Sequence, residues 1–163
     1  WQRAMGYLHL KQTYNKNVKP SKMVGRPSLY RRDKLLKCGF DIYFNGVGGE
    51  DTDLAIRMEQ NGNLQGLGTA ISYRKQSKSF VEIYKKIIKY GKGDAHIIVK
   101  HPHKIKSIVF HQLIRYPFIY SLKALNKKGF IFIPFYMVFG FMRFINMCFY
   151  YREARNKGIR FGY

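Results

Sequence analysis

The stretch "GGEDTDLAIR", residues 48–57, places three carboxylates within four positions, directly after a pair of glycines. These carboxylates are Glu50, Asp51 and Asp53, and they are three of only 9 acidic residues in a chain of 163 residues that carries 30 Lys and Arg. A protein with a formal charge of +21 therefore gathers its scarce carboxylates at one point.

Residues 50–60 have the pattern of a helix, with a partial apolar face and a stop signal at Asn61-Gly62. Carboxylates in the first turn of a helix favour its macrodipole and cap free N–H groups, so the cluster has a purely structural explanation. It also has a catalytic one, because a carboxylate at a helix start that faces a cleft can accept a proton from an incoming nucleophile. The preceding glycines would let a substrate approach closely.

The composition limits the class of protein. A charge of +21 attracts anions, and nucleic acid, acidic lipid headgroups and a phosphorylated small molecule all qualify. An aromatic content of 17% is high for a disordered basic tail, so most of the chain should be ordered. The two cysteines, Cys38 and Cys148, are too far apart in sequence to suggest a disulfide framework or a paired metal motif. Because the chain begins at Trp1 without an initiator Met, we expect a fragment of a longer protein.

The composition changes near residue 95. Up to about Asp94, short apolar runs alternate with Gly and polar turns, which is typical of an α/β domain. Within this part we expect helices over 1–14, 31–39 and 77–91, and extended segments within 22–32 and 63–74. After His96 only one acid, Glu153, remains, and long aromatic-rich apolar runs follow.

Two apolar blocks, 107–125 and 129–151, suggest contact with a membrane. The second is just long enough to cross a bilayer, whereas the first carries Arg115 and Pro117 in its middle and suits an interfacial or kinked segment. Basic residues lie before, between and after the blocks, which favours a shallow hairpin whose connector and ends stay on the cytoplasmic side. The row of lysines at 85, 86, 89 and 92 is either a solvated helix face or a contact with anionic lipid.

The wider sequence carries a resemblance. The residues "GRPSLYRRDKLLKCGFDIYFNGVGGEDTDLAIRMEQNG", 25–62, resemble the second half of family 2 glycosyltransferases. The shared pattern is a Gly-containing strand that ends in an aromatic and a basic pair, a helix, Gly-Phe-Asp, a glycine-rich loop and Glu-Asp-x-Asp-Leu-x-x-Arg. The segment 79–102, with Tyr90-Gly91 and His101-Pro102, resembles membrane-associated members of bacterial exopolysaccharide type.

This resemblance implies a GT-A fold, an α/β domain that binds a nucleotide-sugar. Residues 1–95 would form the acceptor-side part of that domain, and 96–163 a basic, aromatic-rich membrane-associated helical region. The implied activity is inverting transfer of a sugar from a nucleotide-sugar to a hydroxyl of a glycan or lipid-linked acceptor in cell-surface polysaccharide synthesis. The nucleotide-binding half, which would hold Mg²⁺ or Mn²⁺, is expected outside this chain, so the fragment alone should be inactive.

The resemblance also implies roles for particular residues. Asp51 is the candidate catalytic base and Glu50 orients the site. Asp53 matches the acceptor-side motif and is assigned no metal. Arg57 is expected to brace the acidic cluster. The expected substrate-binding residues are Arg31, Arg32, Gly48, Gly49, Asp53 and Arg57. Of these, Arg31 and Arg32 are candidates to neutralise the diphosphate.

The sequence departs from the family in two places. Many members have a His on the strand after the acidic helix, where this chain reads "ISYRK", residues 71–75. Processive members carry Gln-x-x-Arg-Trp where this chain has "KKIIKYG", residues 85–91, so the resemblance points to single-sugar transfer.

Two other classes of protein remain as alternatives. A basic nucleic-acid-binding module would explain the charge and aromatics but neither the acidic cluster nor the apolar blocks, so we expect no nucleic acid partner. A non-catalytic membrane scaffold derived from a glycosyltransferase would explain both. The histidines at 96, 101 and 103 lack a Cys or acid at zinc-ligand spacing. We therefore expect as partners a nucleotide-sugar, an acceptor and a membrane with anionic lipids.

Overall fold

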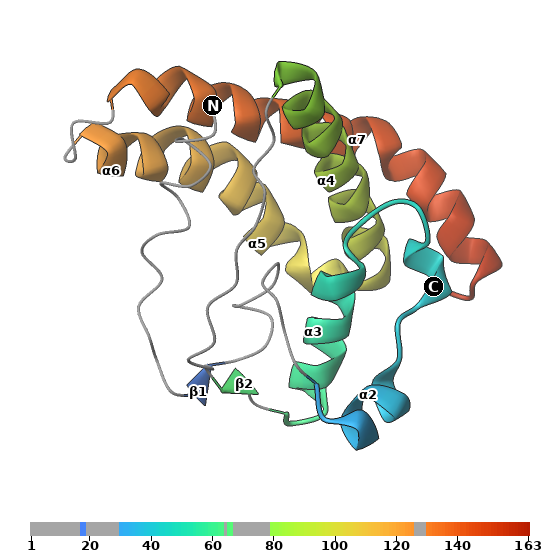
Figure 1. The fold of residues 1–163 in the computed structure, drawn as a ribbon. Helices are drawn as coiled ribbons and strands as arrows, with labels where there is room; N and C mark the ends of the chain where they lie inside the picture. The colour runs from blue at the N-terminus through green and yellow to red at the C-terminus, as the bar shows by residue number, and fades with distance from the viewer. Residues whose placement is uncertain (1–16, 19–29, 64, 67–78, 126–129) are drawn as a thin grey trace.

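The computed structural model describes residues 17–18, 30–63, 65–66, 79–125 and 130–163 (Figure 1). The elements before residue 79 are β1 (Asn17–Val18), α2 (Arg32–Cys38), the 3₁₀ turn η2 (Ile42–Phe44), α3 (Glu50–Gln60) and β2 (Gln65–Gly66). Those after it are α4 (Phe80–Lys100), η3 (Pro102–Lys104), α5 (Ile105–Phe110), η4 (His111–Tyr120), α6 (Ser121–Leu125), η5 (Phe130–Phe132) and α7 (Ile133–Arg160).

The expected α/β GT-A fold is wrong, because the described part of the chain is built almost entirely of helices. Its two strands have two residues each and form one antiparallel pair, with Asn17 opposite Gly66 and Val18 opposite Gln65. The apolar surface that a parallel sheet would bury is instead buried between helices, chiefly α4 and α7. The helix expected over 1–14 and most of the two expected extended segments lie outside the described residues.

The short helices around the acidic cluster begin and end where their capping residues indicate. α2 ends at Gly39, which has a φ of 57°. α3 begins at Glu50 and ends before Asn61, with Gly62 at a φ of 70°. α4 begins after Ser79, whose hydroxyl accepts a hydrogen bond from the Glu82 N–H. It continues past the expected end at Gly91 to Lys100.

The glycines within the long helices are contact points. A Cβ on Gly91 of α4 would lie 2.8 Å from the Arg143 carbonyl oxygen of α7, and one on Gly140 of α7 would lie 2.4 Å from the Gln112 carbonyl oxygen of η4. Only a residue without a side chain lets these helices approach so closely. α7 is therefore packed against α4 and against the arm α5–η4–α6, as Figure 1 shows.

The arm Ile105–Leu125 is one continuous helical segment whose middle, η4, is a π-helix that contains Pro117. Because proline has no N–H to donate and its ring crowds the preceding turn, a wider turn accommodates it. The expected kinked character of this first apolar block therefore takes the form of a π-helical insertion.

A buried ion pair joins the three long helical segments. Asp94 of α4 accepts hydrogen bonds from the Arg143 guanidinium of α7, with 2.8 Å between Nη2 and Oδ1, and from the Gln112 amide of η4 at 2.7 Å. Around it lies an apolar core, of which one cluster comprises Ile83, Ile87, Ala124, Phe135, Tyr136 and Phe139.

Residues Phe130–Arg160 form the one helical stretch, within the described part of the chain, that is long and apolar enough to cross a membrane. This agrees with the expectation from the second apolar block. Only 28% of its apolar window is buried inside the protein, which indicates association with a membrane.

Candidate functional site

The glycine-rich loop before α3 rests on the backbone of α4. Gly46, Gly48 and Gly49 have φ values of 77°, 85° and 91°, a left-handed conformation that side chains disfavour. A Cβ on Gly93 of α4 would lie 2.8 Å from the Gly48 carbonyl oxygen. The loop and α4 thus meet main chain to main chain, and this contact fixes the start of α3 against α4.

Glu50 and Asp51 form the first turn of α3. The preceding cap residue, Gly49, has no side chain to cap the helix. Asp51 is half-buried, and its Oδ1 accepts hydrogen bonds from the Thr52 N–H at 2.8 Å and from the Thr52 hydroxyl at 3.5 Å. The Oε2 of Glu50 is buried and has no hydrogen-bond partner among the described residues. Two carboxylates therefore stand at the same helix end, one of them with an unsatisfied buried oxygen.

Asp53, two residues after Asp51 in the first turn of α3, lies in a different environment. Its side chain is 0% exposed, and its carboxylate contacts Lys100 Nζ at 3.0 Å, His101 Nε2 at 2.8 Å and Arg57 Nε at 2.8 Å. Burial alone would raise the pKa of Asp53, but the hydrogen bonds from His101, Lys100 and Arg57 outweigh it and hold the pKa below its usual value. Asp53 anchors α3 to the end of α4.

Lys100 links this anchor to a second carboxylate, Asp41. Asp41 is bonded to Lys100, to the Tyr163 hydroxyl and to the Tyr43 N–H, the last at 2.8 Å. Burial works against ionisation of Asp41, but the hydrogen bonds from Lys100, Tyr163 and the backbone prevail and lower its pKa to about 2. The same two carboxylates raise the pKa of Lys100 against the effect of its burial, so the ammonium stays charged.

The three clustered acids are thus divided by their surroundings. Asp53 and four other acids in the chain form ion pairs: Asp33 with Arg31, Asp41 with Lys100, Asp94 with Arg143, and Glu153 with Lys92. Glu50 and Asp51 form no ion pair with any residue that the structure describes. In a chain with 30 basic residues, two neighbouring carboxylates that have no cation within the described part stand out as candidates for another partner.

No ion pair or hydrogen bond among the described residues joins the arginines of the expected site to this pair. Arg31 is exposed and pairs with Asp33 at 3.1 Å, and Arg32 is the exposed first residue of α2. Arg57 donates to the Gly39 carbonyl oxygen at 2.7 Å, to the Cys38 carbonyl oxygen and to Asp53. Arg57 therefore braces α3 against the C-terminal end of α2. Contact of Arg31 and Arg32 with a diphosphate stays a prediction.

The sequence alone predicted no role for three members of the Asp53 network, namely Asp41, Lys100 and His101. Asp41 and His101 occur in the quoted Gly-Phe-Asp and His-Pro motifs, which offered the only signal for them. Nothing in the sequence marked Lys100, because its role depends on α4 continuing to a residue that meets both Asp41 and Asp53.

The donor set around the acidic cluster does not fit a divalent cation. Asp53 already contacts an ammonium and a guanidinium group, which would repel a cation, and Glu50 and Asp51 alone supply too few ligands. No group of three or more His, Cys, Asp or Glu suited to a metal occurs among the described residues. We therefore derive no step through a metal from this part of the chain.

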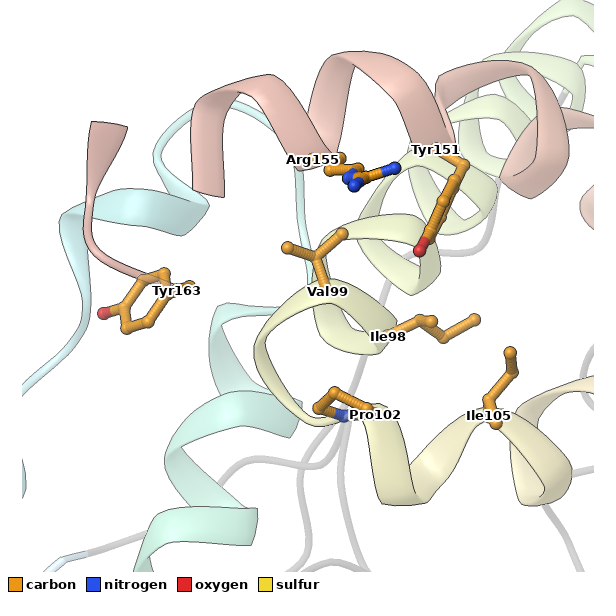
Figure 2. A pocket seen from close by; sticks show the side chains of 7 residues that line it. All are labelled: Ile98, Val99, Pro102, Ile105, Tyr151, Arg155 and Tyr163. Atoms are coloured by element: carbon orange, nitrogen blue, oxygen red, sulfur yellow. The ribbon is translucent and has the colours of Figure 1, made fainter. Parts of the chain in front are cut away.

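A separate groove of about 270 Å³ lies between the end of α4 and the C-terminal part of α7 (Figure 2). Its lining contains no residue of the acidic cluster. It comprises Ile98, Val99, Pro102, Ile105, Tyr151, Arg155 and Tyr163. Apolar side chains thus meet one arginine and two tyrosines where α7 becomes polar.

Comparison with known proteins gives no further guidance, since no protein-family model, curated protein or solved structure matches this chain.

Proposed function

We propose that this chain is the acceptor-side part of an inverting glycosyltransferase, with Asp51 as the catalytic base. The observation that carries the proposal is the division of the acidic cluster. Asp53 is held by cations inside the protein, whereas Asp51 and Glu50 have no cationic partner among the described residues and sit beside a glycine loop. The proposal rests on this helix end and its chemistry. It does not depend on the expected α/β fold, which the structure contradicts.

The reaction assigns one proton transfer to this site. An acceptor hydroxyl oxygen attacks the anomeric carbon of a nucleotide-sugar, and its proton passes to the Asp51 carboxylate. The bond between the anomeric carbon and the phosphate oxygen breaks, and its electron pair leaves with the nucleoside diphosphate. Direct displacement of this kind inverts the configuration at that carbon. The donor would be bound mainly by residues beyond those described.

The surroundings of Asp51 suit such a base. The hydrogen bonds from Thr52 occupy Oδ1 and leave Oδ2 without a partner among the described residues. The N-terminus of α3 favours negative charge on neighbouring groups. Glu50, whose Oε2 is buried without a hydrogen-bond partner among the described residues, would orient the site.

We propose that the enzyme acts at the cytoplasmic face of the cell membrane. Nucleotide-sugars are expected in the cytosol, and the apolar helix Phe130–Arg160 gives the chain a membrane-seeking surface. A charge of +21 attracts the anionic lipids that enrich this face. The acceptor in this setting is a glycan or a lipid-linked sugar.

The test is sugar transfer by membranes from cells that produce the complete protein, supplied with a panel of nucleotide-sugars. Asp51→Asn keeps the shape of the side chain but cannot take the proton, so transfer should fall by about 10²–10⁴-fold. The nucleoside diphosphate released and the sugar incorporated into acceptor are both measured.

A matched control separates chemistry from folding. Asp33→Asn makes the same change at an exposed acid on α2 and should keep full activity. Both variants should stay within about 1 kcal/mol of the wild type in urea unfolding. If Asp51→Asn transfers sugar as fast as Asp33→Asn, Asp51 only stabilises the start of α3. If the wild type uses no nucleotide-sugar, the scaffold alternative replaces the enzyme.

A further inference from the structure

The exposed surface of α7 changes character along its length. From residue 134 to 149 every exposed residue is apolar or weakly polar: Pro134, Met137, Val138, Phe141, Ile145, Cys148 and Phe149. The polar residues of this half turn inward, Arg143 to Asp94 and Asn146 to the Met142 carbonyl oxygen. After Tyr151 the exposed face is mainly polar and basic, with Arg152, Arg155 and Arg160.

α4 accompanies α7 along nearly its whole length. The Tyr90 and Phe139 rings lie 6.5 Å apart, Gly91 meets Arg143 and Asn146, and Gly158 meets Val99. An α7 that crossed a bilayer would therefore carry α4 into the hydrocarbon with it.

α4 is not suited to hydrocarbon. Its exposed face includes Lys85 and Lys89. Charged side chains at the depth of a bilayer centre are strongly unfavourable unless they reach water or a partner. The length and composition of α7 permit a span, but its packing against α4 does not.

The arm α5–η4–α6 shows the pattern of an interfacial helix. Phe110, Ile114, Phe118 and Leu122 recur every four residues and are all exposed. Exposed cationic residues, Lys106, Arg115 and Lys123, occur along the same arm. A helix with a continuous apolar stripe and basic residues beside it lies in the plane of a membrane surface.

We infer that α7 lies in the plane of one leaflet, with the exposed apolar side chains of its first half and of the arm immersed in an anionic phospholipid surface. α4 covers the opposite side of α7 and faces water. The second half of α7, with Tyr151 and Arg155 beside the groove of Figure 2, lies at the level of the headgroups, where tyrosine and arginine are favoured. This inference deepens the membrane association proposed above and is independent of sugar transfer.

A depth profile along α7 tests the inference. Single cysteines at Val138, Phe141, Ile145 and Phe149, in a Cys38→Ser, Cys148→Ser background, carry a fluorophore quenched by lipids with nitroxides at known depths. The vesicles contain phosphatidylcholine with phosphatidylglycerol. An in-plane helix gives nearly equal depths, whereas in a spanning helix residues 138 and 149 differ by about 16 Å. A graded profile overturns the inference. Labels that stay in water also overturn it.

A pair of matched variants tests the surface itself. Ile145 and Ile159 are almost equally exposed, at 62% and 64%, but only Ile145 belongs to the apolar half. Ile145→Glu should weaken binding to the anionic vesicles by about tenfold or more, and Ile159→Glu by about twofold or less. Equal losses would overturn the assignment of this face. Vesicle binding and depth are read without any sugar, so their failure is distinguishable from failure of the proposed enzyme.

Discussion

Replacing Asp53 with Asn should destabilise the protein strongly. The carboxylate is 0% exposed and contacts Lys100, His101 and Arg57 within 3.0 Å. An amide removes the negative charge and presents N–H donors where cations already stand. Breaking a buried pair by removing one partner costs about 3–5 kcal/mol. This is a large part of the roughly 5–15 kcal/mol by which a domain is normally stable.

The assay is urea unfolding followed by far-UV circular dichroism, with Asp33→Asn as the matched change in an exposed ion pair. The control pair, whose Asp33 side chain is 51% exposed, should lose at most about 1 kcal/mol. Combining Asp53→Asn with Lys100→Met should cost less than the sum of the single changes, because the double variant leaves fewer unpaired buried charges.

The difference between wild type and Asp53→Asn should also depend on pH. The native pKa of Asp53 lies below its unfolded value, so the charge stabilises the fold above the unfolded pKa of about 3.9. The difference should be constant between about pH 5 and 7 and should shrink as pH falls through the native pKa. If Asp53→Asn unfolds like Asp33→Asn at neutral pH, the network does not anchor α3.

Three further changes have definite expected outcomes. Gly93→Ala places a Cβ 2.8 Å from loop backbone, so it should reduce both stability and transfer. Gly158→Ala places a Cβ 2.6 Å from the Val99 side chain instead of backbone, so it should cost less. Unfolding midpoints and initial rates decide this. Asp94→Asn leaves the inward-facing Arg143 without its carboxylate and should cost about 3–5 kcal/mol in urea unfolding. The pKa of Asp41 is about 2 in the native protein, below its ordinary value of 3.8. This difference stabilises the folded state by roughly 2.5 kcal/mol at neutral pH. That contribution should disappear between about pH 4 and pH 2, and an Asp41→Asn variant should lack this acid-sensitive component.

Local signals predicted the local structure well. Gly39 and Asn61-Gly62 mark the ends of α2 and α3, and the bounds of these helices follow from them. The fold class could not be predicted in this way, because Gly was interpreted as a sign of turns. At Gly91 and Gly93 it instead permits close contacts of a continuous helix, and that difference depends on residues of α7 and of the glycine loop.

The division of roles within the acidic cluster was equally inaccessible to local reasoning. Asp51 and Asp53 are two residues apart in one helix and look equivalent in sequence. They differ because Lys100 and His101, which follow more than forty positions later in the printed sequence, reach Asp53 only after α4 has folded against α3. Candidate site residues could therefore be named from the motif, but the bound and the available carboxylates could be separated only by tertiary contacts.

Gly91 and Gly93 give α4 one further property. One glycine receives α7 and the other receives the loop that leads into Glu50, and the two are only about 3 Å apart along the helix axis. The same turn of α4 thus positions both α7 and the loop that leads into the acidic pair. If α7 lies at a fixed depth as proposed, the carboxylates would stand at a fixed height above the lipid surface. The proposed enzyme would then select acceptors partly by the distance of their hydroxyl group from the bilayer. It would reach hydroxyls at one distance and miss those nearer or farther.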